Sequence, residues 1–481
     1  MDYIINNKQA SMEINSEAKP KLLESYIASL FGEDKYLNFN IYNNSDLADL
    51  ISKLESIDIY TVEEVEIILQ ALRVHAARYG KIDGWKSPIN ILFNILNDRC
   101  NKVLPLVHDQ ILTTVENIYS HLSSQNQTIA LQTIYIMQHF NADALKLFVK
   151  YFADPKNIGL NNTIMYHTIN SFKEIIPENI DWFVNNLTPI LAFEDFRAVA
   201  VLELFSHYVA NNVIKEHPIK DNLIVIERWL DNISNPEKFS YAISGCAALS
   251  LVNSPQSILL LKRAAHHPDL NIQLEAVFAQ IILNVNGSHQ LMIDLLLNPK
   301  ISIKAHNYVN ELAENYKIKV FIPSYVDKKI RSTVFEAIAV MCSWLNHERE
   351  YGRAPDTIAI WDKQDLLWPT TGEIETVYLL KYSYTSYEYK SKPDVDKIGF
   401  CILKGNNERV YSMSKNYSDK MIAYADYLRH EYDIVANVPK DHIEEQAAYA
   451  DYLKQDYGKI ESIDDALRLL YKLNPHLTAY D

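Results

Sequence analysis

Histidine is the commonest metal ligand in proteins, and three histidines of this sequence are candidates for such chemistry. His266 and His267 are adjacent at the end of a predicted helix, and His347 is followed by Glu348 near the end of another. Adjacent helical side chains point roughly 100° apart, so one ion would need further ligands from elsewhere in the chain. His347 has no second histidine at the spacing of a zinc-protease helix. The four cysteines also lie far apart, with no CxxC spacing. The sequence therefore predicts no metal site and no cofactor.

Enzymes that cleave glycosidic bonds usually use a pair of carboxylates, and tryptophans beside such a pair are suggestive of a sugar-binding site. One stretch contains such residues, namely Asp362, Asp365, Glu373 and Glu375 with Trp361 and Trp368. Acidic loops of many proteins contain similar residues, and no pattern of a large barrel or cleft accompanies these. The sequence also lacks the glycine-rich loops that bind nucleotide phosphates and the turn that presents a serine nucleophile. We therefore expect no catalytic residue.

A tyrosine-rich and acidic segment occurs twice near the C-terminal end of the sequence. AYADYLRHEYD begins at Ala423, and AYADYLKQDYG begins at Ala448, 25 positions later. Residues 351–481 contain 16 of the 31 tyrosines. Residues 421–481 contain 12 Asp or Glu and 6 Lys or Arg, so their net charge is −6. On a helix, the first two tyrosines of each copy are neighbours, and an Asp and a basic residue pair on the wetter side.

Two interpretations of this repeat are open. Two amphipathic helices can pack as an antiparallel pair, in which tyrosine is a core residue with a polar tip. Alternatively, tyrosine rings beside carboxylates form a surface for a basic protein, because they offer large contact area at low entropic cost. Under the second interpretation the candidate partner-binding residues are Tyr424, Asp426, Tyr427, Glu431, Tyr449, Asp451, Tyr452 and Asp456.

The composition of the chain indicates the class of protein to which these residues belong. Of 481 residues, 48% are hydrophobic and 22% are charged, as in a soluble globular protein. Only 11 are glycine, which favours helices joined by short turns. The net charge of −15 argues against a nucleic-acid ligand and suits a basic protein partner. No apolar run reaches the ~18 residues of a membrane-spanning helix, and no signal-peptide pattern is present, so we expect no membrane contact and a cytoplasmic location.

Helical periodicity dominates the chain as far as residue 318. Thr61 and Glu64 have the spacing of a capping box, which opens a helix to about Tyr79. Further helices are predicted near 88–98, 102–121, 125–139, 142–152, 161–175, 178–192, 195–213, 220–233, 237–252, 255–266, 270–285, 288–297 and 301–316. Two of the turns between them contain Pro268 and Pro299, 31 residues apart.

The segments Asp269–Ala276 and Lys300–Ala305 start the second helix of each pair with the same polar, apolar and alanine pattern. In this pattern the sequence resembles HEAT repeats, most clearly in the last two or three units of residues 100–316. The resemblance implies an α-solenoid, in which each helix pair buries its apolar side against its neighbours. An irregular helical bundle is the alternative.

The sequence pattern changes at about residue 320, where a helix is predicted at 334–347 and strand-like periodicity follows it. Strands are predicted at 357–361, 376–389, 398–403 and 409–413, which form a small antiparallel meander of three or four strands. Alternation along the second strand puts Tyr382 and Tyr384 on one face, with Tyr378 at the same parity. Helical patterns return at 417–432, 440–457 and 462–473.

Two motifs in this part, Tyr351–Asp356 and Trp368–Glu373, precede the aromatic strand and a strand containing Gly399. With these motifs, residues 340–404 are similar to the module that follows helical repeats in uncharacterised bacterial HEAT-repeat proteins. That resemblance implies an architecture and carries no activity that can be transferred.

The predicted fold is thus mainly α, with a HEAT-like α-solenoid followed by a small α+β domain. The expected divisions are an N-terminal cap at 1–58, helical repeats at 59–318, a linker at 319–333 and the α+β domain at 334–481. We expect a non-catalytic protein-interaction module, in sharpest form an antitoxin or immunity-type inhibitor of a basic toxin or enzyme. The alternatives are a lyase or hydrolase of unrecognised type that uses the solenoid groove, and a structural scaffold.

Overall fold

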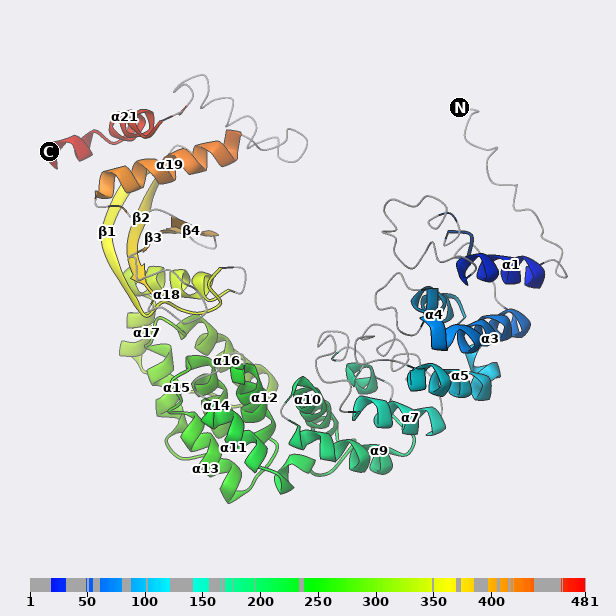
Figure 1. The fold of residues 1–481 in the computed structure, drawn as a ribbon. Helices are drawn as coiled ribbons and strands as arrows, with labels where there is room; N and C mark the ends of the chain where they lie inside the picture. Colours follow the sequence, from blue (N-terminus) through cyan, green and yellow to red (C-terminus); the bar gives the residue numbers. More distant parts are fainter. Residues whose placement is uncertain are drawn as a thin grey trace, which may run out of the picture. The chain divides into compact units, whose positions relative to one another are not determined.

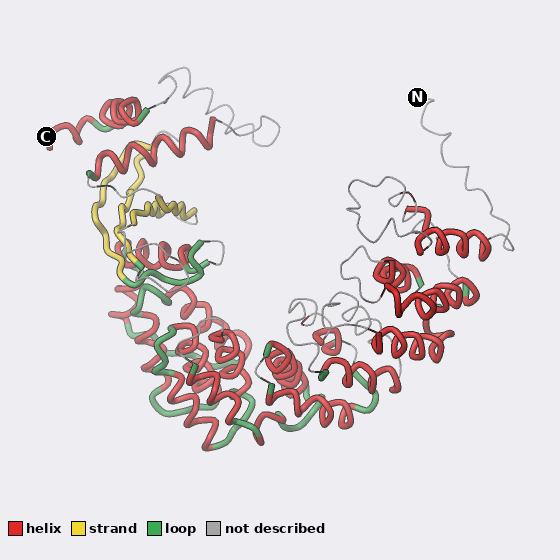
Figure 2. Tube along the Cα trace, viewed as in Figure 1, coloured by secondary structure: helices red, strands yellow, loops and turns green. Residues whose placement is uncertain are grey.

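The computed structural model forms two compact units, Met1–Ser257 and Ile258–Asp481. It describes residues 19–31, 49, 52–54, 61–79, 88–100, 103–121, 142–154, 166, 169–174, 176–193, 195–232, 238–347, 350–368, 373–384, 397–404, 407–413, 417, 419–436, 460 and 462–480. In these ranges the protein is mainly helical, with a small four-stranded antiparallel sheet (Figures 1 and 2). The helices expected at 125–139 and 440–457 lie outside the described residues. No helix within the described ranges is both long and apolar enough to cross a membrane.

Unit 1 consists of helices and short connections. Its α-helices are α1 (Lys19–Phe31), α3 (Val62–Tyr79), α4 (Pro88–Arg99), α5 (His108–His121), α7 (Ala142–Phe152), α9 (Ile180–Leu187), α10 (Phe196–Ala210), α11 (Ile224–Asp231) and α12 (Phe239–Leu249). The 3-10 helices η3 (Leu104–Val107), η5 (Ser171–Lys173), η6 (Thr188–Ala192) and η7 (Pro218–Asp221) lie between them. The predicted capping box is confirmed at the start of α3. The Glu64 carboxylate accepts the Thr61 N–H at 2.7 Å, and Thr61 Oγ1 accepts the Glu64 N–H at 3.4 Å.

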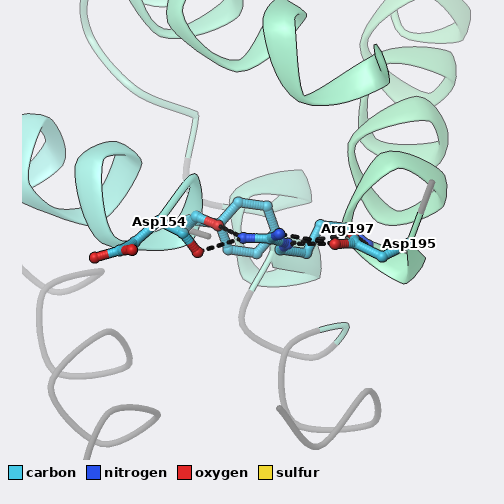
Figure 3. Close-up of polar contacts among 4 residues, drawn as sticks. Asp154, Asp195 and Arg197 are labelled. Carbon is cyan, nitrogen blue, oxygen red and sulfur yellow. Dashed lines mark hydrogen bonds and ion pairs between the residues drawn. The ribbon is translucent and has the colours of Figure 1, made fainter. Parts of the chain in front are cut away.

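A buried arginine joins two of these helices (Figure 3). Arg197 lies in the first turn of α10, and its guanidinium donates to the carbonyls of Phe152 and Asp154 at the end of α7, both at 2.8 Å. Asp195, the N-cap residue of α10, accepts the Arg197 N–H and pairs with the guanidinium at 2.7 Å. The carboxylate balances the buried charge, while carbonyls at a helix end gain the donors that they lack within the helix.

A buried histidine, His217, lies just before η7. Its Nδ1 accepts the Ile219 N–H at 3.1 Å, so the ring is neutral and carries its proton on Nε2. That nitrogen lies 3.3 Å from the Leu202 carbonyl oxygen and 3.2 Å from Ser206 Oγ. Burial lowers the pKa of His217 to about 4, because a charged ring would lose its hydration there.

The helical part of unit 2 consists of α13 (Pro255–Ala264), in whose first turn the two units divide, α14 (Leu270–Ile282), α15 (Ser288–Leu296) and α16 (Ser302–Asn315). All four were predicted from periodicity. Two polar contacts join α14 to α16. Lys304 Nζ donates to Asn271 Oδ1 at 2.9 Å, and the Tyr308 hydroxyl donates to Glu275 Oε2 at 2.6 Å. Both pairs are separated by 33 residues, so the two helices lie side by side with matched positions.

The rest of unit 2 contains α17 (Ser324–Ile330), α18 (Thr333–Leu345), the sheet, α19 (Lys420–Ala436), α21 (Ile463–Leu473) and the 3-10 helix η9 (Pro475–Tyr480). The strands β1 (Thr357–Trp368), β2 (Glu373–Ser383), β3 (Lys397–Lys404) and β4 (Asn407–Met413) pair antiparallel in sequence order, as a meander does. The predicted meander is confirmed. The stretch expected as a linker at 319–333 includes α17, whose Val326 is buried.

Both faces of the sheet are covered by helices. Val377 and Leu379 of β2 pack with Phe400 into a core that α19 and α21 complete. Tyr378 and Tyr382 point the opposite way, into a core with Met341 of α18. In Figure 1 the sheet accordingly lies between α18 and the pair α19 and α21. Because successive side chains of β2 point to opposite faces of the sheet, this strand contributes to two separate hydrophobic cores.

The close approach of α18 to the sheet depends on Gly399 of β3. A Cβ atom at this position would lie 2.0 Å from Met341 Cε and 3.2 Å from the Tyr411 carbonyl oxygen. Real Cβ contacts are longer, so a larger residue here would force the end of the Met341 side chain out of this site.

We predict that Gly399→Ala lowers the free energy of unfolding by about 1–3 kcal/mol through overpacking. Met341→Ala alone should cost about 2–5 kcal/mol, because it leaves a cavity. If the alanine Cβ and Met341 compete for one space, the double variant loses less stability than the sum of the two single variants. Urea denaturation of the four proteins measures this, and strictly additive losses would contradict the proposed contact.

We also predict a specific loss of stability in acid from His217. Its pKa of about 4 in the folded protein lies below its ordinary value of 6.5. Between these values the unfolded chain binds a proton that the folded chain does not, so the free energy of unfolding falls as pH drops through 6.5 towards 4. Between pH 7 and pH 5, His217→Gln should lose about 1–2 kcal/mol less stability than the wild type. Equal losses in urea denaturation at the two pH values would show that His217 is not the group responsible.

Candidate interaction surface

The first copy of the repeated tyrosine segment lies in α19, and its two leading tyrosines are core residues. Tyr424 and Tyr427 are at most 1% exposed. The Tyr427 ring stacks on Phe400 of β3 at 4.3 Å between centroids, and Tyr424 meets the same ring edge-on at 5.3 Å. The prediction that these two rings contact a partner is therefore corrected: they cover one face of the sheet and offer no surface.

Of the other candidate partner-binding residues in the repeat, one has a structural contact and the side chains of the rest lie outside the described part of the structure. The Asp426 carboxylate accepts a hydrogen bond from the Tyr417 hydroxyl, which ties α19 to the segment before it. The Tyr424 hydroxyl lies 3.5 Å from Asp362 Oδ2, and burial raises the pKa of this tyrosine. The side chain of Glu431 and the whole second copy, Tyr449, Asp451, Tyr452 and Asp456, lie outside the described residues. For these five residues, binding to a basic partner stays a prediction.

The histidines singled out from the sequence do not gather. His266 is exposed at the end of α13. His267 is buried, and its Nδ1 accepts the Asp269 N–H at 3.0 Å in the turn before α14. His347 follows the end of α18. In the part of the chain that the structure describes, no three His, Cys, Asp or Glu side chains form a group that could hold a metal ion.

Three of the four carboxylates near the tryptophans take part in polar pairs within the sheet or between the sheet and α19. Asp365 Oδ1 accepts the Thr376 hydroxyl at 2.7 Å across β1 and β2. Glu375 is buried and pairs with Arg409 of β4. Asp362 pairs with Lys420 at the start of α19, at 3.3 Å.

The motif Tyr351–Asp356 has a similar structural role at the end of the sheet. Arg353 binds the Asp356 carboxylate with two hydrogen bonds, at 2.9 and 3.1 Å. The Tyr384 hydroxyl donates to the Arg353 carbonyl at 3.0 Å, and its ring stacks on Tyr351 at 4.7 Å. These side chains are matched with one another and fix the chain before β1 against the end of β2.

Among the residues of unit 2 that the structure describes, the exposed aromatic side chains lie instead in the connection between α16 and α18, residues 316–332. Phe321 is 81% exposed, Tyr325 63% and Tyr316 44%. The connection itself is well anchored. The Tyr316 ring meets Phe278 edge-on at 5.7 Å. Val326 is buried, and α17 packs against α15 and α18. The exposed rings are therefore held on a supported segment.

This connection is also basic, although the chain as a whole is acidic. It contains five basic residues and one acid, so its net charge is +4. The five, all exposed, are Lys317, Lys319, Lys328, Lys329 and Arg331. Arg331 Nε, just after the end of α17, donates to Asp327 Oδ1 of that helix at 2.7 Å. The lysines carry most of the charge that a partner would meet.

The sequence contains a signal for this surface that the linker prediction did not use. The charged run Asp327–Arg331 suggested a linker, whereas its neighbour Ile318–Ile322 is rich in β-branched and aromatic residues. Flexible linkers are typically rich in small polar residues, and charged linkers are extended because their charges repel one another. A basic run close to an apolar segment, in a chain that is acidic as a whole, fits neither kind of linker.

No family model matches the sequence, and no curated protein is similar enough to be matched.

We predict that Tyr427→Ala lowers the free energy of unfolding by about 3–5 kcal/mol, because it removes a buried aromatic ring from the core under the sheet. Ile422→Ala on the same helix is the matched control. Ile422 is 38% exposed, so its truncation should change stability by less than about 1 kcal/mol. Thermal melting of both variants measures this. Similar melting temperatures for the two would return Tyr427 to the list of surface candidates.

Proposed function

We propose that the protein is a non-catalytic recognition module that binds another protein. The observation that carries this proposal is the pair of exposed aromatic rings, Phe321 and Tyr325, on the anchored connection 316–332. A phenylalanine in water forgoes the free energy of burial, about 25 cal/mol per Å² of apolar surface. Clustered exposed apolar residues on a supported segment are typical of interaction sites.

The residue types support protein recognition. Aromatic side chains supply most of the binding energy in many protein interfaces, and charged residues around them speed association and select the partner. In the connection, three aromatic rings and four lysines lie within 17 residues. Such a surface would bury Phe321 and Tyr325 on binding and leave the lysines at the rim.

For the helical part we propose the HEAT-like arrangement that the sequence resembles. Its support is the equal spacing of the contacts Asn271–Lys304 and Glu275–Tyr308, which match α14 with α16. Repeats of this kind present long surfaces to protein partners. Inhibition of a basic toxin or enzyme, through the acidic residues of 421–481, stays a prediction, as does a cytoplasmic location.

We predict that Phe321→Ser combined with Tyr325→Ser abolishes binding to the partner that wild-type protein retains from a lysate of its own cells. Both residues are exposed, so the melting temperature should stay within a few degrees. The dissociation constant for the purified partner should rise at least tenfold.

Ile374→Ser is the matched control, because Ile374 is 74% exposed in the same unit but belongs to β2. It should bind the partner like the wild type. Equal retention by the Phe321→Ser, Tyr325→Ser variant would contradict the proposed function at this surface.

A further inference from the structure

Residues 318–323 have the sequence of a β-strand but belong to no sheet in the described structure. The sequence Ile-Lys-Val-Phe-Ile-Pro favours extended backbone. Its exposure alternates: Lys319 and Phe321 are exposed, whereas Ile318, Val320 and Ile322 are partly buried. This period of two is that of a strand with one face on the protein.

One side of this segment has free backbone groups. The Ile318 N–H donates to the Leu312 carbonyl of α16 at 2.9 Å. Within the described ranges, the backbone amides of Lys319, Val320, Phe321 and Ile322 have no hydrogen-bond partner. In an extended chain, successive amides point to opposite sides, so those of Lys319 and Phe321 point away from α16. A row of such groups is a template for a further strand.

The charge of the segment indicates what kind of strand would bind. Lys317 and Lys319 are exposed beside the free edge, in a connection of net charge +4. An acidic side chain on an added strand would pair with them. Nucleic acids and anionic membranes are also negative, but they extend over long distances and would meet the net charge of −15 of the chain. A short acidic peptide contacts only the basic segment, since charge is screened over about 8–10 Å.

We propose that residues 318–323 bind an extended acidic segment of a partner protein, which adds to them as a β-strand. This inference rests on the proposed recognition function and specifies its chemistry. Main-chain hydrogen bonds would supply affinity, while the Lys319 and Phe321 side chains would select acidic and apolar positions of the peptide.

The first test uses the full-length protein and a fluorescein-labelled decapeptide of alternating glutamate and valine, with lysine in place of glutamate as the control peptide. Fluorescence anisotropy should show at least tenfold tighter binding of the glutamate peptide. Charge reversal at Lys317→Glu and Lys319→Glu should invert this preference. Absence of binding, equal binding of both peptides, or tighter binding of oligothymidine or phosphatidylserine vesicles would overturn the proposal.

The second test separates backbone pairing from charge. Lys319→Ala and Lys319→Pro both remove the charge, but only proline also removes the N–H that points to the partner. The proline variant should bind the glutamate peptide at least fivefold more weakly than the alanine variant. As a measurement that needs no variant, the peptide should slow hydrogen exchange at the amides of Lys319 and Phe321 and leave that of Val320 unchanged. Equal affinities with unchanged exchange would overturn strand addition.

The two proposals fail in distinguishable ways. If the lysate partner depends on Phe321 and Tyr325 while the glutamate peptide does not bind, acidic strand addition is wrong and the recognition function stands. If the partner is retained without these two rings, the recognition function at this surface is wrong.

Discussion

A strand with two apolar faces must be covered on both sides, and β2 imposes this constraint on unit 2. Val377 and Leu379 face one way and Tyr378 and Tyr382 the other, and all four are buried. Water cannot be excluded from both faces by one layer of helices, because side chains alternate at every residue. The sheet therefore requires α18 on one face and the pair α19 and α21 on the other.

This constraint accounts for much of the tyrosine excess at the C-terminal end. A tyrosine ring fills a core while its hydroxyl reaches a polar partner, which suits a layer that is only one helix thick. The hydroxyl of Tyr424 reaches Asp362, and that of Tyr382 reaches Ser412. These two tyrosines are core residues, one on each face of the sheet. Among the described residues of unit 2, the exposed aromatic side chains are instead Tyr316, Phe321 and Tyr325, in the connection 316–332.

Polar side chains in the helical parts act in a similar way, as ties between neighbouring elements. Arg197 links the end of α7 to the start of α10, and Glu275 with Tyr308 links α14 to α16. In both cases the buried charged group has partners that offset its desolvation. Several residues of types that suggest catalysis or metal binding therefore have structural partners within the fold. The lysines of the connection 316–332 differ from them in being exposed.

The elements themselves were determined by short-range rules that the sequence contains. The capping box at Thr61, the turns at Pro268 and Pro299 and the alternation along β2 predicted helices and strands that the structure has. The face that each element buries was decided only by tertiary structure. Tyr427 is amphipathic and suits either core or surface, and its contact with Phe400, 27 positions away, places it in the core. Likewise, the basic run after Pro323 predicted a linker. The packing of α17 against α15 and α18, which supports this segment, became evident only in the tertiary structure. Local propensity acts within a few residues, whereas burial depends on which distant segments meet, and local sequence patterns do not identify those segments.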